Sequence, residues 1–219
     1  MKIMTIGDLH GLDIWKKFIE EKADIYVFLG DYVDSFTVED KPMISNLLNI
    51  IEFKKNNENV FLIWGNHDLQ YIDSRMRCSG YRWRISYKLE QIYRENYDLF
   101  NPMIYIGNYV WSHAGIHQGW FDHQFKGTKI RDIIDAFNSD SNDALLDIGH
   151  YRGGTKPVGG IFWADKRMTS KKPLKGYHQI VGHHPVDEIT TIYKNNNTSI
   201  TYCDCLERGH SRRPYILDL

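Results

Sequence analysis

The sequence has little cysteine and no long apolar run. Its three cysteines, Cys78, Cys203 and Cys205, are an odd number without the spacing of a disulfide framework. This argues against a secreted, disulfide-stabilised domain and favours a reducing compartment, with the cytoplasm as the default. No 18 consecutive residues are apolar, and Asp8 interrupts the N-terminal apolar residues. We therefore expect neither a membrane-spanning helix nor a signal peptide.

The sequence also lacks an excess of charge of either sign. Lys and Arg number 27 and Asp and Glu 28, which gives a formal net charge of -1. No overall positive field attracts nucleic acid or an anionic membrane, so such a partner would have to be recognised locally. With 219 residues, 42% hydrophobic and 25% charged, the chain is expected to form a single domain over residues 1–219, and a disordered or fibrous protein is excluded.

The first half of the sequence repeats one pattern. Short apolar runs at residues 2–6, 25–29 and 60–64 each end in Gly-Asp or Gly-Asn. Apolar residues at helical spacing within residues 12–22 and 42–55 predict helices between these runs. Strands separated by such helices predict a largely parallel sheet, with ligands bound at the carboxyl ends of its strands.

The second half predicts further strands and two insertions. A Gly-Asn turn separates expected strands at residues 103–106 and 109–112, and further strands are expected at residues 177–181, 189–193, 198–203 and 214–219. Residues 69–100, which are polar and aromatic, are expected to be a helical insertion over the active face. Residues 116–160 are expected to be a second cap or insertion segment.

Polar residues cluster at five of the predicted strand ends. They are Asp8, His10, Asp31, Asp34, Asn66, His67, His113, His183 and His184. Oxygen and imidazole donors without thiolate suit manganese, iron or zinc rather than a structural cysteine site. A single Gly-Asp or histidine usually marks a turn or a buried side chain. Five strand ends that all carry such residues, in this order, are unlike a set of independent occurrences.

These motifs resemble, in order, the signature of the calcineurin-like metallophosphoesterases. They are Gly7-Asp8-Leu9-His10-Gly11, Gly30-Asp31-Tyr32-Val33-Asp34, Gly65-Asn66-His67-Asp68, Ser112-His113-Ala114-Gly115 and Gly182-His183. The chain is most similar to the phosphoprotein phosphatase branch, including bacterial and phage serine/threonine phosphatases and symmetrical diadenosine tetraphosphatases. The resemblance implies a four-layer α/β/β/α sandwich, with two mixed β-sheets flanked by helices and a helical insertion, in place of one parallel sheet.

The resemblance also implies two divalent metal ions, with manganese the first expectation and iron, zinc or nickel as alternatives. It assigns Asp8 and His10 to the first ion, Asp31 to both, and Asn66, His113 and His183 to the second. Two ions roughly 3.5 to 4 Å apart can hold both a nucleophile and a phosphoryl oxygen, and a water bridging them ionises near neutral pH. The implied reaction is direct attack of this hydroxide on phosphorus.

The same resemblance assigns proton transfer to His67. This residue matches the general acid that protonates the leaving oxygen, and Asp34 matches the carboxylate that orients it. General acid catalysis contributes roughly 10² to 10⁴ in rate.

The sequence departs from the family pattern where phosphate is usually bound. Ser35 stands where arginine is usual, and residues 68–70 replace a glutamate and arginine. A guanidinium binds two phosphate oxygens at once, so another arginine is expected to supply it. Arg152, in a glycine-rich loop, is the first choice, although a surface arginine beside a flexible loop explains it equally well. Arg82 and Arg84 of the insertion are the next choices.

Three other features leave alternatives open. His184 is an extra ligand or acid, or more simply a spectator. The basic aromatic run over residues 75–94 binds nucleic acid or forms a solvated helix face whose arginines pair with acids. The segment 203–205 is expected to belong to a strand rather than to a zinc site.

The leading hypothesis is a two-metal phosphohydrolase acting on phosphomonoesters, similar to phosphoprotein serine/threonine phosphatases. Its expected partner is a phosphorylated protein or nucleotide, with no membrane. Alternatives are a dinucleoside polyphosphate hydrolase, a nucleic-acid end phosphatase and a non-catalytic scaffold with this fold. The complete set of ligand positions argues against the scaffold.

Overall fold

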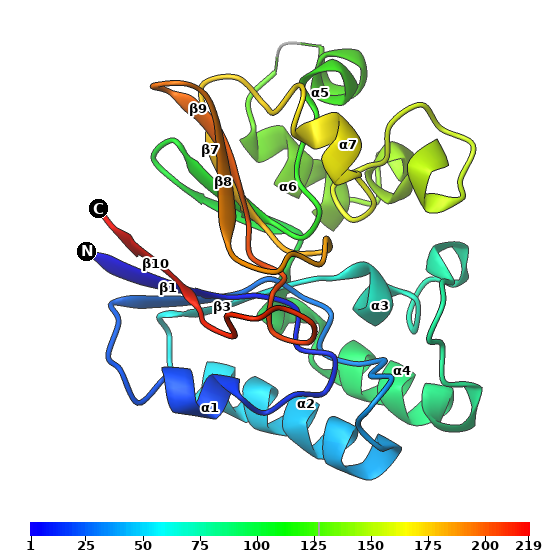
Figure 1. Ribbon diagram of the computed structural model, residues 1–219. Helices are drawn as coiled ribbons and strands as arrows, with labels where there is room; N and C mark the ends of the chain where they lie inside the picture. The colour runs from blue at the N-terminus through cyan, green and yellow to red at the C-terminus, as the bar shows by residue number, and fades with distance from the viewer. Residues whose placement is uncertain (127) are drawn as a thin grey trace.

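Two five-stranded β-sheets lie face to face at the centre of the protein in the computed structural model (Figure 1). The structure describes residues 1–126 and 128–219. Within this part of the chain, no helix has the length and apolar character needed to cross a membrane.

The first sheet has the strand order β10-β1-β2-β3-β4. Its strands are β10 (Tyr215–Asp218), β1 (Lys2–Ile6), β2 (Ile25–Phe28), β3 (Val60–Ile63) and β4 (Phe100–Asn101). Strands β1 to β4 are parallel, and β10 is antiparallel to β1. The three apolar runs of the first half and the closing strand are therefore confirmed.

The second sheet has the order β5-β6-β7-β9-β8. Its strands are β5 (Met103–Ile106), β6 (Tyr109–Ser112), β7 (His178–Val181), β9 (Thr198–Tyr202) and β8 (Thr190–Asn195). Two pairs are parallel and two are antiparallel. The expectation of one largely parallel sheet is wrong, because the two hairpins of the second half add antiparallel edges to a separate sheet. Two mixed sheets flanked by helices are confirmed.

Helices cover the outer faces of both sheets (Figure 1). Below the first sheet are α1 (Trp15–Phe18), α2 (Asp40–Lys55) and α4 (Ser86–Glu95), and above the second are α5 (Gln118–Phe125), α6 (Arg131–Asn138) and α7 (Lys166–Thr169). The helix α3 (Asn66–Leu69) follows β3, and short 3₁₀ turns occupy Ser74–Met76, Trp83–Ile85, Tyr97–Leu99, Asp143–Leu146 and His150–Arg152. The helix expected over residues 12–22 is a single turn, because the apolar residues on either side of it belong to turns instead.

Both faces of the first sheet are buried. One face packs against the second sheet through Ile3, Val27, Leu29, Ile63, Ile104, Trp111, Ile180 and Cys203. The alternate residues of the same strands belong to the core under the helices. Burial on both faces explains why these strands appear in the sequence as continuous apolar runs.

The two expected insertions lie mostly in the helical layers. In residues 69–100, α4 lies with α2 on the outer face of the first sheet (Figure 1), whereas Cys78 and Ser79 line the cavity described below. Residues 116–160 carry α5 and α6 over the second sheet and also the loop of Arg152. The open cavity therefore lies between loops from both halves of the chain.

Candidate metal centre

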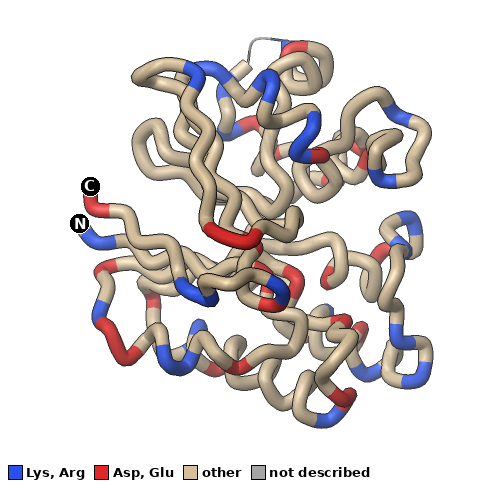
Figure 2. The backbone as a smooth tube through the Cα atoms, viewed as in Figure 1, with Lys and Arg blue, Asp and Glu red and all other residues tan. Residues whose placement is uncertain are grey.

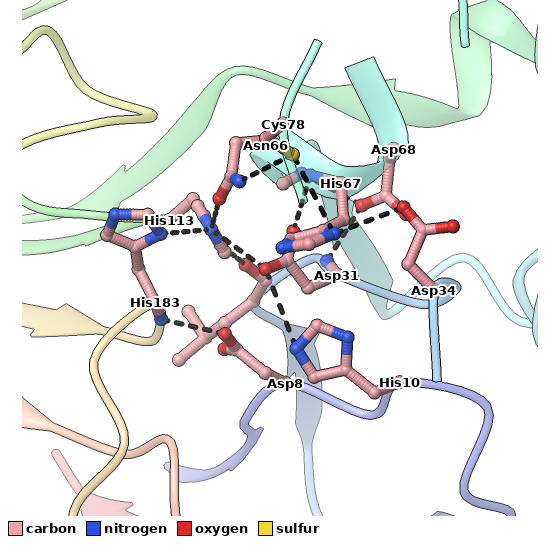
Figure 3. Close-up of polar contacts among 12 residues, drawn as sticks. Asp8, His10, Asp31, Asp34, Asn66, His67, Asp68, Cys78, His113 and His183 are labelled. Carbon is pink, nitrogen blue, oxygen red and sulfur yellow. Dashed lines mark hydrogen bonds and ion pairs between the residues drawn. The ribbon is translucent and has the colours of Figure 1, made fainter. Parts of the chain in front are cut away.

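Loops that follow strands of both sheets bring the predicted histidines and carboxylates together (Figure 3). Asp8, Asp31 and Asn66 follow β1, β2 and β3, while His113 and His183 follow β6 and β7. Positive φ angles occur at His10, Asp31, Asp34 and His183, at 44°, 52°, 65° and 64°. Left-handed backbone in residues other than glycine costs of order 1–3 kcal/mol each, and such strain concentrates at functional sites.

The side chains that could hold metal ions form two groups that share one carboxylate. One group contains Asp31, His113 and His183, the other Asp8, His10 and Asp31, and the donor atoms within each lie within 4.8 Å of one another. The Asp31 Oδ2 atom is 3.4 Å from His113 Nε2 and 3.8 Å from His10 Nε2. Asp31 is thus placed between the two groups, as a bridging ligand would be.

Backbone carbonyls orient the two imidazoles beside Asp31. The Nδ1 of His10 donates to the oxygen of Val33 at 2.9 Å, and that of His113 to the oxygen of Leu29 at 2.8 Å. Because a carbonyl can only accept, the proton is held on Nδ1, and Nε2 presents its lone pair to the site. Outer hydrogen bonds of this kind fix the tautomer that a metal ion requires.

Two polar atoms lie close to the Nε2 atom of His113. This nitrogen is 2.8 Å from Asn66 Oδ1 and 3.1 Å from His183 Nδ1. Burial lowers the pKa of His113, but the charge of Asp31 and the hydrogen bonds to Asp31 and Leu29 together raise it above its ordinary value. Burial and the positive charge of Arg152 hold the pKa of His183 well below its ordinary value, which keeps that imidazole neutral.

Two buried polar atoms at the site have no hydrogen-bond partner. They are Asp8 Oδ1 and His183 Nε2. Buried polar groups are normally satisfied, so unpaired acceptors beside converging carboxylate and imidazole donors call for a cation. Burial and the neighbouring Asp204 raise the pKa of Asp8 well above its ordinary value, a cost that a cation would remove. The residues present therefore fit divalent metal ions.

His67 and Asp34 form an ion pair at the edge of this centre. The Nδ1 of His67 donates to Asp34 Oδ2 at 3.1 Å. Gln70 and Tyr71 also donate to the Asp34 carboxylate. Burial opposes protonation of His67, but the charge of Asp31 and the bond to Asp34 raise its pKa well above the ordinary value. His67 is therefore set up to carry a proton at the cavity it lines.

The carboxylate of Asp68 links the two loops, after β2 and after β3, that carry these residues. Its carboxylate accepts the backbone N–H groups of Asp31 at 2.7 Å, Tyr32 at 3.0 Å and Gly65 at 2.9 Å. The Tyr93 hydroxyl of α4 donates to the same carboxylate at 2.5 Å. Burial and the charge of Asp31 nevertheless raise the pKa of Asp68 to about 7, so these bonds offset desolvation only in part.

Arg152 lies where the glycine-rich loop meets the centre. It lines the same cavity of about 280 Å³ as Asp8, His10, Asp31, Asn66 and His183. Its Nε is 3.0 Å from Asp165 Oδ2, and its Nη2 donates to the oxygen of His183 at 3.3 Å. The guanidinium is thus already fixed beside one of the metal-binding residues.

The alternative arginines are held elsewhere. Arg82 donates to the backbone oxygens of Ser35 and Val38 and pairs with Asp40. Arg84 is exposed, with its guanidinium 5.4 Å from the ring of Trp83. Neither side chain lines the cavity.

His184 also lies outside the cavity. The backbone N–H of Lys166 donates to its Nε2, and Arg152 Nη2 lies 2.8 Å from its ring nitrogens. Burial and the charge of Arg152 lower the pKa of His184 to about 3, so the ring is neutral. This placement favours the spectator interpretation over an extra ligand or acid.

The basic aromatic run makes ion pairs on the surface. Arg75 pairs with Asp73 at 2.6 Å and with Asp143 at 2.5 Å, and Arg94 pairs with Glu90 at 2.8 Å. Figure 2 shows Lys and Arg spread over both halves of the molecule, with Asp and Glu among them. These contacts favour the solvated-face interpretation.

Several residues that line the cavity were not predicted from the sequence. They are Phe36, Cys78, Ser79, Trp163, Asp204, Glu207 and Arg208. The strand expected through residues 198–203 ends at Tyr202, so residues 203–205 lie beyond it. A carboxylate directly after a predicted strand was the available signal for Asp204, because Asp8 and Asp31 also follow strands.

Comparison with known proteins agrees with this geometry. A model of the calcineurin-like phosphoesterases matches residues 1–211. The chain belongs to this family. It is accordingly a metal-dependent phosphoester hydrolase. No curated protein gives a significant match.

Solved structures show the same fold. The cold-active protein-tyrosine phosphatase of a psychrophilic Shewanella species matches with a TM-score of 0.69 and 15% identity, over 99% of this chain and 75% of the other. Another structure of a cold-active protein tyrosine phosphatase gives 0.66 and 16%, over 99% and 73%. At this identity the likeness concerns the fold alone.

Replacing the Asp68 carboxylate tests how much the site depends on it. Asp68→Asn turns an amide toward buried backbone donors, so we expect the free energy of unfolding to fall by about 2–4 kcal/mol in urea titrations. The exposed Asp98→Asn of the same region should change it by less than about 0.5 kcal/mol. Equal stability of the two variants would contradict the role of Asp68.

Proposed function

We propose that the protein hydrolyses phosphomonoesters, including the side chains of phosphoproteins, with two divalent metal ions. Manganese is the first expectation for their identity. Asp8, His10 and Asp31 would hold one ion and Asp31, Asn66, His113 and His183 the other. The observation that carries this proposal is the pair of donor groups joined by Asp31.

The ions, when bound, would supply a nucleophilic water and stabilise charge on the phosphoryl oxygens. Side chains of the protein would donate the proton and bind the phosphate. His67 would donate its proton to the leaving oxygen, and Asp34 would keep the imidazole protonated and oriented. Arg152 would bind the outer phosphate oxygens, with Asp165 fixing its guanidinium.

The resemblance in sequence points to phosphoserine and phosphothreonine, while the structural neighbour named above is a protein-tyrosine phosphatase.

A dinucleoside polyphosphate is the second candidate substrate. The observation that favours it is a second arginine, Arg208, in the cavity that Arg152 lines. A nucleic-acid end phosphatase stays an alternative. Phosphate release from phosphopeptides, nucleotides and phosphorylated oligonucleotides, and ADP release from diadenosine tetraphosphate, each measured with manganese, separate these classes.

The metal stoichiometry is the first prediction. The protein is loaded with Mn²⁺, and the unbound Mn²⁺ is then removed. Elemental analysis should find about two ions per chain, because both donor groups are complete. Asp31→Asn should weaken both sites in equilibrium dialysis and Asp8→Asn chiefly one, while the exposed Asp13→Asn should weaken neither. A single ion at saturation, or equal mild effects of the first two variants, would refute the bridging role.

The second prediction concerns the proton donor. His67→Asn should keep its metal content but lose roughly 10² to 10⁴ in kcat on alkyl phosphates, whose leaving oxygen needs a proton. The loss should be much smaller on p-nitrophenyl phosphate, whose leaving group is stable as an anion. Steady-state kinetics on both substrates gives the comparison. The same fractional loss on each would place proton donation elsewhere.

The third prediction concerns phosphate binding. Arg152→Lys keeps the charge but loses the bidentate contact, so kcat/KM should fall by roughly 30-fold, or ~2 kcal/mol. Arg167→Lys is the matched control, because Arg167 also pairs with Asp165 but does not line the cavity. A structure with phosphate bound would show which nitrogen contacts the anion. If Arg208 alone does so, the assignment of Arg152 is wrong.

A further inference from the structure

An exposed aromatic side chain stands at the rim of the polar cavity. Phe36 lines the cavity, yet 63% of it is exposed. Trp163 also lines the cavity but is buried. A ring that stays in water contributes little to folding through burial, so its position needs another explanation.

The loop that carries Phe36 is held in a fixed shape. The Ser35 hydroxyl accepts the backbone N–H groups of Thr37 at 3.1 Å and Val38 at 2.9 Å. Arg82 donates to the backbone oxygens of Ser35 and Val38, which precede and follow Phe36 in the sequence. Ser35, which stands where the family motif has arginine, therefore builds a turn instead of binding phosphate. The turn presents Phe36 with its backbone already ordered.

Phe36 lines the same cavity as the candidate proton donor. It follows Asp34 by two residues, and Asp34 holds His67. The rings of His67 and His10 are 5.1 Å apart, and both line the cavity with Phe36. A leaving oxygen that takes its proton from His67 would therefore have its substituent in the cavity that Phe36 lines.

We propose that Phe36 is a specificity-determining residue that packs against the ring of a phenolic leaving group, such as the phosphorylated side chain of tyrosine. This inference rests on the proposed phosphomonoesterase function. The ring of a phenolic ester is attached directly to the oxygen that leaves. In a nucleotide the ribose separates the base from phosphate, so an aromatic side chain in the same cavity as the proton donor favours the phenolic ester. Contacts between two aromatic rings change affinity by about 2- to 12-fold.

The test compares two phosphopeptides that differ only in phosphotyrosine or phosphoserine. Phe36→Ala should lower kcat/KM on the phosphotyrosine peptide by about 2- to 12-fold, mainly through KM, and change the phosphoserine peptide by less than about 2-fold. Phe36→Tyr, which keeps a ring, should retain the preference. Trp83→Ala is the control, because Trp83 is 72% exposed and lies outside the cavity lining.

Binding of phosphonates provides a readout without turnover. Phe36→Ala should raise the inhibition or dissociation constant of benzylphosphonate and leave that of pentylphosphonate unchanged. Equal changes for both phosphonates, equal losses on both peptides, or a loss confined to nucleotides would overturn the role of Phe36. If the metal-loaded protein hydrolyses no phosphomonoester, the proposed function fails, while calorimetry with the two phosphonates still decides the question for Phe36.

Discussion

The arrangement of the metal centre depends on one buried carboxylate. Asp68 accepts three backbone N–H groups from the loops after β2 and β3, and it also reaches Tyr93 in the helical layer. These bonds hold the backbone of Asp31, which has a left-handed φ of 52° that aspartate does not favour by itself. The position of the shared carboxylate is therefore set by a side chain that does not face the cavity.

A second constraint is electrostatic, since most atoms that face the centre are acceptors. His10 and His113 donate through Nδ1 to carbonyls outside the centre, and the inward lone pairs of His113 and Asn66 face each other. His67 differs because its Nδ1 donates to a carboxylate. The partner of Nδ1 therefore differs among histidines that lie within one small volume.

Much of the centre could be predicted from the sequence because each ligand follows an apolar strand within a short motif. Asp8 and His113 were found in this way, and the structure brings them together. The second sheet could not be predicted by the same means, because strand order depends on contacts between distant residues. Phe36 was missed for a related reason, since neither motif spacing nor periodicity shows which loop residues line a cavity.

The centre draws its side chains from both sheets. Asp8, Asp31 and Asn66 come from the first sheet, and His113 and His183 from the second. A ligand that needs both sets binds only when the two sheets are docked, so its binding energy adds to the cohesion of the sandwich in proportion to RT ln(1 + [L]/Kd). If divalent ions occupy this centre, their removal would loosen the interface between the sheets, and the resistance of the protein to heat and proteases would depend on the ions in the buffer.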